Sequence, residues 1–204
     1  MKPTAATAAS VRPGSDIFFQ GAFMVLQICK YGEKVLREKS VPVASVTEEL
    51  RILASDMLET MRKARGVGLA AQQIGRTEKM CVIEIPEGCE DDEDELFNAP
   101  VVMPLKLFNP EIIAKEGSQR DKEGCLSFPG IGGSVTRAQQ VTCQYLDENN
   151  RPQIITVRGF LARALQHEID HLNGVLYVDH LSAIERLSFS SKLKKLAKAN
   201  GGVR

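Results

Sequence analysis

The stretch His167-Glu168-Ile169-Asp170-His171 lies inside an apolar segment that starts after Gly159 and ends at Asn173-Gly174. Four residues turn an α-helix through about 400°, so the two imidazoles lie on one helix face about one turn apart. Buried histidine and glutamate side chains need partners, which a metal ion can provide. The stretch therefore predicts a metal-binding helix with Glu168 beside the ion as a general base. Apolar residues around it indicate that this helix is buried: Phe160, Leu161, Ala164, Leu165 and Leu172.

The two histidines leave a third protein ligand to be found, because a catalytic site of this kind uses three protein ligands and an open position. One protease pattern continues as H-E-x-x-H-x-x-G-x-x-H; Gly174 is in place here, but Tyr177 stands where the last histidine is needed. Glu185, in a following helical segment, is a second candidate. Cys125 is a third, because a thiolate binds zinc and iron strongly. The residues alone do not decide whether Glu185 or Cys125 is the third ligand.

A glycine-containing loop comes directly after a segment with an amphipathic helical pattern. Its sequence is Gly66-Val67-Gly68-Leu69-Ala70-Ala71-Gln72-Gln73. Its glycines permit close backbone approach, and its two alanines leave room for a ligand. Gln73 can donate an amide N–H to a developing oxyanion. Taken alone, the pattern is equally typical of a tight turn packed on a core.

In combination, three segments resemble those of the peptide deformylase family, which carries G-φ-G-φ-A-A-x-Q, E-G-C-φ-S and H-E-x-x-H in this order. The first is the loop that ends at Gln73, the second is Glu123-Gly124-Cys125-Leu126-Ser127, and the third contains the two histidines. Tyr31-Gly32 with Val35-Leu36-Arg37 also resembles the family's opening strand and turn. The resemblance extends from about residue 24 to about residue 181.

The resemblance implies an enzyme that removes the formyl group from the N-terminal methionine of new proteins, co-translationally and with release of formate. It implies one metal ion per chain, usually Fe(II), with Zn(II) or Ni(II) as substitutes, bound by Cys125, His167 and His171. Glu168 would be the general base and acid. Gln73 and the backbone N–H of Leu126 would stabilise the oxyanion.

The resemblance also implies where the substrate lies. The peptide follows the strand edge at the first motif, and its methionine side chain enters an apolar pocket. The implied substrate-binding residues are Gly66, Val67, Gly68, Leu69, Glu123 and Gly124.

This chemistry is physically reasonable for a formamide, which is a poor electrophile. A divalent cation lowers the pKa of its bound water, and Glu168 can take that proton and later pass it to the departing amine. The soft thiolate of Cys125 favours iron or zinc over magnesium or calcium.

Two other kinds of metal site are alternatives. A zinc metalloprotease with Glu185 as third ligand would cleave internal peptide bonds and leave Cys125 dispensable. A structural zinc module would need a closed site with a fourth protein ligand, for which His180 is the candidate. That module would leave Glu168 and Gln73 without a role.

Composition excludes several other classes. The 204 residues have a formal net charge of +0, so no global charge attracts DNA or a membrane surface, and no apolar run reaches the roughly 20 residues of a membrane span. Five cysteines are an odd number, and no secretory apolar segment precedes them, which predicts reduced thiols and the cytoplasm. Cys29, Cys81 and Cys143 have apolar neighbours and are expected to be buried, whereas Cys89 is expected to be exposed.

The chain is expected to form a flexible extension at residues 1–23 and a single catalytic domain at residues 24–204. An amphipathic helix capped by Thr47 and ending near Gly66 precedes strands at 79–85, 105–115, 139–146 and 153–157. This pattern predicts an α+β fold in which mixed or antiparallel β-sheets wrap around the central helix that carries HEIDH.

Two charged segments complete the prediction. The acidic run at 90–95 lacks the spacing of a calcium loop and is expected to be a solvated, mobile insertion. The C-terminal helix, at about 182–199, is basic; a solvated surface helix is the simpler interpretation, and ribosome contact through its lysines is the alternative.

Overall fold

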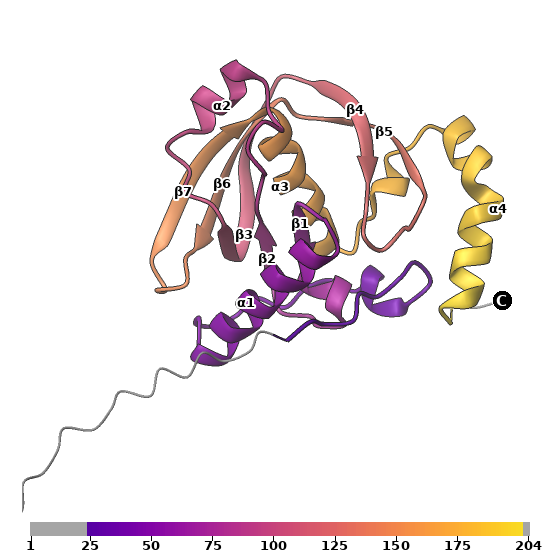
Figure 1. Ribbon diagram of the computed structural model, residues 1–204, viewed down its shortest axis with the longest axis horizontal. Helices are drawn as coiled ribbons and strands as arrows, with labels where there is room; N and C mark the ends of the chain where they lie inside the picture. The colour runs from indigo at the N-terminus through magenta and orange to yellow at the C-terminus, as the bar shows by residue number, and fades with distance from the viewer. Residues whose placement is uncertain (1–23, 202–204) are drawn as a thin grey trace, which may run out of the picture.

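The computed structural model describes residues 24–201, which form an α+β fold (Figure 1). The expected extension at 1–23 lies outside the described residues. The helices are η1 (Lys34–Arg37), α1 (Glu48–Lys63), η2 (Ala71–Ile74), α2 (Asp92–Asn98), α3 (Gly159–Leu172), η3 (Tyr177–Asp179) and α4 (Ala183–Ala199). The strands are β1 (Gly68–Ala70), β2 (Met80–Ile83), β3 (Leu105–Glu116), β4 (Gln119–Gly124), β5 (Gly132–Arg137), β6 (Gln140–Leu146) and β7 (Pro152–Arg158).

Two antiparallel sheets surround α3, which carries the HEIDH stretch. Five strands form one sheet in the order β1-β2-β3-β6-β7, and β4 and β5 form a separate hairpin. Figure 1 shows α3 between the five-stranded sheet and this hairpin. The predicted fold class is therefore confirmed. The hairpin was not expected as strand, because its polar residues and glycines do not alternate with apolar ones.

Strand β2 is buried on both faces, which explains its unbroken apolar sequence. Cys81 and Ile83 pack in the core that includes α3, whereas Met80 and Val82 pack in the core that includes α1. The two methionines of α1, at 57 and 61, are fully buried in the second core. The sheet is thus held between the two helices.

Helix α1 begins where the sequence predicts. The Thr47 side chain accepts a hydrogen bond from the Leu50 N–H, and Glu48 and Glu49 occupy the first turn, where negative charge is favourable. The helix ends at Lys63, and the chain then turns into β1.

Four of the six acidic side chains at 90–95 are exposed, as expected of a solvated insertion, but the run is attached to the rest of the fold through Glu90 and Asp94. It leads into α2, which is attached to the start of α3: Glu90 Oε1 accepts from the Leu161 N–H at 2.9 Å, and Asn98 exchanges two hydrogen bonds with the Arg158 backbone. The first amides of a helix lack partners within the helix and attract negative charge. Glu90 provides that charge to α3.

Contact between α2 and α3 is close at Gly159. This residue has φ +61°, and a Cβ at its position would lie 1.9 Å from Asp94 Oδ2. The Asp94 carboxylate is buried there, 3.6 Å from the Arg158 guanidinium. Glycine at position 159 is therefore required by backbone conformation and by space.

Helix α4 lies at the outer side of the hairpin (Figure 1). Ser182 and Glu185 form a capping box at its start, as expected for a helix near 182–199, and Leu193 is its buried residue. Ile184 and Leu187 are exposed, and so are Lys192, Lys194, Lys195 and Lys198. None of the described helices is both long and apolar enough to span a membrane.

Candidate active site

The predicted metal ligands converge although they come from two parts of the chain. His167 and His171 lie one turn apart on α3, and Cys125 follows the end of β4. One ligand atom from each lies within 4.8 Å of the other two, and Cys125 Sγ is 3.3 Å from His171 Nε2. A thiolate with two imidazoles is a donor set that suits zinc or iron.

A buried carboxylate orients the first histidine. Glu123 Oε2 lies 3.0 Å from His167 Nδ1, which leaves Nε2 of that ring for a metal ion. Arg137 and Arg163 bind the same carboxylate, at 2.9 Å and 2.7 Å. Asp170 pairs with the other end of Arg137. His167 is thus fixed by a buried, charge-balanced network.

Charged neighbours determine the ionisation of two groups. Burial by itself raises the pKa of Glu123, but His167 and Arg137 more than offset this and hold that pKa well below its usual range. Burial also raises the pKa of the Cys125 thiol, whereas His171 and His167 lower it to about 5 overall. Both residues are anions at neutral pH, and Cys125 is a thiolate ready to bind a cation.

Glu168 occupies a different environment on the same helix. Its side chain is buried, its Oε2 has no hydrogen-bond partner among residues 24–201, and Gly68 packs directly against it. Burial raises the pKa of Glu168 to about 7, an effect that His167 and His171 partly offset. A carboxyl group with such a pKa can accept and return a proton near neutral pH.

The amide of Gln73 has a fixed orientation. Its Oε1 accepts a hydrogen bond from the Ala70 N–H at 2.8 Å, and its Nε2 lies 3.4 Å from Cys125 Sγ and from Ser127 Oγ. The amide hydrogens therefore point toward the cysteine and the serine hydroxyl.

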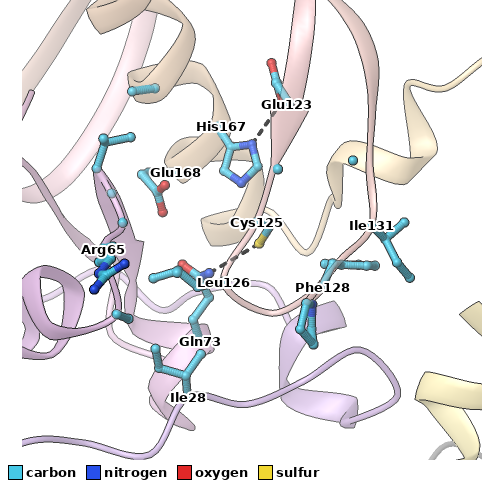
Figure 2. A pocket seen from close by; sticks show the side chains of 18 of the residues that line it. Ile28, Arg65, Gln73, Glu123, Cys125, Leu126, Phe128, Ile131, His167 and Glu168 are labelled. Atoms are coloured by element: carbon cyan, nitrogen blue, oxygen red, sulfur yellow. Dashed lines mark hydrogen bonds and ion pairs between the residues drawn. The ribbon is translucent and has the colours of Figure 1, made fainter. Parts of the chain in front are cut away.

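These side chains open into a cavity of about 810 Å³ (Figure 2). Gly66, Val67 and Gly68 form part of its wall, and β1 is the edge strand of the five-stranded sheet. Glu123 and Gly124 line it as well. Its apolar lining comes from Ile28, Val67, Leu126, Phe128, Ile131 and Phe160.

Comparison with known proteins shows to which family this chain is similar. The family described as "Polypeptide deformylase" matches residues 25–187. The peptide deformylase of Desulfitobacterium hafniense is 45% identical over 162 residues, which cover 79% of this chain and 98% of that protein. This chain belongs to the polypeptide deformylase family. The family and the fold support metal-dependent deformylation, the hydrolysis of the formyl group on N-terminal formylmethionine.

Solved deformylase structures share the fold. The Ehrlichia chaffeensis peptide deformylase has a TM-score of 0.75 at 39% identity, covering 86% of this chain and 98% of that one. A Synechococcus elongatus peptide deformylase in complex with actinonin has a TM-score of 0.70 at 38% identity, covering 87% and 89%. A metal ion is implied by the deformylase family, and the cysteine–histidine cluster fits one.

Neither alternative ligand joins the deformylase cluster. Glu185 lies at the start of α4, where its carboxylate accepts hydrogen bonds from the Ser182 hydroxyl and from the Ser134 N–H of β5. His180 Nε2 lies 2.8 Å from Asp170 Oδ2 at a partly exposed position. Glu185 is therefore not the third ligand, and His180 does not close the site.

Sequence reasoning missed the two arginines that bind Glu123. Arg163 was the available signal, because a charged residue within an apolar helix needs a buried partner. Arg137 carried no such signal, since it ends a strand that was not recognised.

Proposed function

We propose that Cys125, His167 and His171 hold one metal ion at which the formyl group is hydrolysed. The observation that carries the proposal is the convergence of these ligand atoms within 4.8 Å at a cavity also lined by Glu168 and Gln73. We assign Fe(II) as the physiological metal, with Zn(II) or Ni(II) as substitutes, because a thiolate and two imidazoles suit these ions. When bound there, the ion supplies Lewis acidity and lowers the pKa of a water molecule.

Glu168 is the proposed general base and acid. Its unpartnered Oε2 is available to take a proton from the attacking water, and the same carboxyl group then protonates the departing amine. Gly68 leaves room for the carboxylate, since a Cβ there would lie 2.3 Å from Glu168 Oε1. The pKa of about 7 supports both directions of transfer.

Gln73 and Leu126 are the proposed oxyanion donors. The Gln73 Nε2 is aimed at the Cys125 sulfur, and the Leu126 N–H has no acceptor among residues 24–201. One well-placed donor of this kind typically contributes about 3–4 kcal/mol to the transition state. Both donors are held by the chain before substrate arrives.

We propose that the peptide lies along the free edge of β1 and the two residues before it, in contact with Gly66, Val67, Gly68 and Leu69. Strand β1 pairs with β2 on one side, so its other edge can accept an extended chain. The methionine side chain then enters the apolar part of the cavity. Glu123 and Gly124 contribute to the opposite wall, where the Glu123 side chain serves mainly to orient His167.

Formate release from formyl-Met-Ala-Ser, with protein prepared anaerobically and loaded with Fe(II), tests this function. We expect formate from the formylated peptide only, and no cleavage of its internal bonds. Internal cleavage, or tightly bound zinc without formate release, would contradict the proposal.

Residues 24–204 are proposed as one catalytic domain that acts in the cytoplasm on nascent chains. Helix α4 is the proposed ribosome contact, because its exposed lysines can neutralise RNA phosphates. Truncation after Ser182 should weaken ribosome binding most at low salt. Binding that is unchanged by the truncation would remove α4 from the proposal.

A further inference from the structure

Besides Arg163, which binds Glu123, three cationic residues line the cavity: Lys30, Arg65 and Lys122. None of them has an ion-pair partner within residues 24–201, and the Lys30 ammonium donates to the Leu126 carbonyl. The Glu123 carboxylate in the same wall is balanced by its two arginines. The accessible charge around the cavity is therefore positive.

Arg65 differs from its neighbours on the chain. Arg62 pairs with Glu84 and Lys63 with Glu59, whereas the exposed Arg65 side chain has no carboxylate partner in the described part of the chain. Its backbone has φ +56°, a conformation that glycine or asparagine adopts at lower cost. Arg65 is thus a strained backbone position that carries a long, charged and unpaired side chain at the cavity.

The position of Arg65 follows from the direction of a peptide on β1. The proposed base touches Gly68, so the formylated residue lies near that glycine. A chain that pairs antiparallel with the edge then runs from Gly68 back toward Gly66 and Arg65. Strands advance about 3.3 Å per residue, so Gly68 at the start of β1 and the preceding Val67 and Gly66 face about the first three peptide residues. Gly66 faces the third substrate residue and has no side chain, so the long Arg65 side chain next to it is the charged group on this edge that the third substrate side chain can reach.

We infer that Arg65 is a specificity-determining residue that favours an acidic side chain at the third position of the formylated peptide. The inference rests on the proposed function and adds a preference beyond methionine. Figure 2 shows Arg65 on the side of the cavity opposite Phe128 and Ile131. An acidic residue there gains an ion pair with a cation that has no competing carboxylate, whereas a lysine is repelled.

The test compares three substrates that differ only in charge: formyl-Met-Ala-Asp, -Asn and -Lys, all as C-terminal amides so that no terminal carboxylate competes. For the unmodified enzyme, kcat/KM should be about two- to fivefold higher for the Asp than for the Lys peptide, the range of a partly exposed ion pair. The preference should shrink as salt is raised from 20 mM to about 0.5 M.

Two variants isolate the side chain from the backbone. Arg65→Asn removes the charge and tolerates the positive φ, so it should give nearly equal rates with the three peptides. Arg65→Asp should reverse the order. Lys115→Glu on β3, outside the cavity lining, makes the same change in net charge as Arg65→Asp and should leave the order unaltered. Thermal unfolding of each variant checks that the fold is retained.

The outcomes distinguish a failure of the role of Arg65 from a failure of the proposed function. Formate release with no charge preference, or a preference that survives Arg65→Asn and Arg65→Asp, would overturn the role of Arg65 and leave deformylation intact. Formate from none of the three peptides would overturn the proposed function and the inference together.

Discussion

Glu123 Oε2 lies 3.0 Å from His167 Nδ1, and the same carboxylate binds two buried arginines. A metal-binding histidine that is held in this way keeps its tautomer and orientation. We expect Glu123→Gln to lower metal affinity by about 10- to 100-fold, because an amide orients the ring less strongly than a carboxylate. Chelator competition measures the change. Unaltered affinity in a folded variant would show that the ring is held by packing alone.

Glu168→Gln should retain the metal and lose activity by about 10²- to 10⁴-fold, because the amide cannot accept the proton from water. The two side chains have nearly the same shape, so the buried space beside Gly68 is preserved. Metal content and formate release on the same preparation provide the test. A near-normal rate would exclude Glu168 as the base.

Cys125→Ser should bind the metal much more weakly, since a neutral hydroxyl replaces a thiolate whose pKa is about 5. Metal analysis after dialysis against a mild chelator measures this loss. His171 is not changed in this variant, so its environment shows whether α3 is still folded. Metal retention equal to that of the unmodified protein would remove Cys125 from the ligand set.

Gly159→Ala should destabilise the protein more than Gly88→Ala does. Both glycines have positive φ, but a Cβ at Gly159 meets Asp94, whereas a Cβ at Gly88 meets nothing within 4 Å. The added overlap should make the loss in unfolding free energy greater by about 1–3 kcal/mol. Chemical denaturation of both variants tests this, and equal losses would show that α2 moves aside freely.

Asp179→Asn should reduce stability at neutral pH but not in acid. Burial raises the pKa of Asp179, while Arg37 and the Leu176 N–H lower it to a net value below the usual range. The folded state thus favours the anion, so the stabilisation is present above about pH 4 and is lost as pH falls through the folded-state pKa. Both side chains of the pair are about one-third or more exposed, which limits the effect to below about 1 kcal/mol. Denaturation at pH 7 and pH 3 measures it; an equal difference at both values would contradict the assignment.

The helix that carries the two histidines and the long strands could be predicted because local patterns determine them. Apolar spacing around His167 indicates burial, Thr47 is a capping residue, and the alternating strands flank recognisable turns. The predicted meeting of Cys125 with the two histidines depended on the family resemblance, because residues 42 positions apart carry no local sign of contact.

Features that depend on distant partners could not be read from composition. Glu90 and Asp94 have the sequence context of solvated acids, but Glu90 accepts from an amide at the start of α3 and Asp94 is buried beside Arg158. The hairpin β4–β5 lacks apolar alternation, so the burial of Arg137 at its end was also missed. In each case a charged residue has its partner far away in the sequence.

The attachment of α2 to α3 has a practical consequence for anyone who modifies this enzyme. The acidic segment between β2 and β3 has the composition of an expendable surface loop, the usual choice for a tag, a label or a shortened linker. Its Glu90 and Asn98 hold the backbone where the ligand-bearing helix starts. An insertion there would disturb the contacts at the start of α3, the helix that carries both histidines. Tags should therefore be placed elsewhere on the surface.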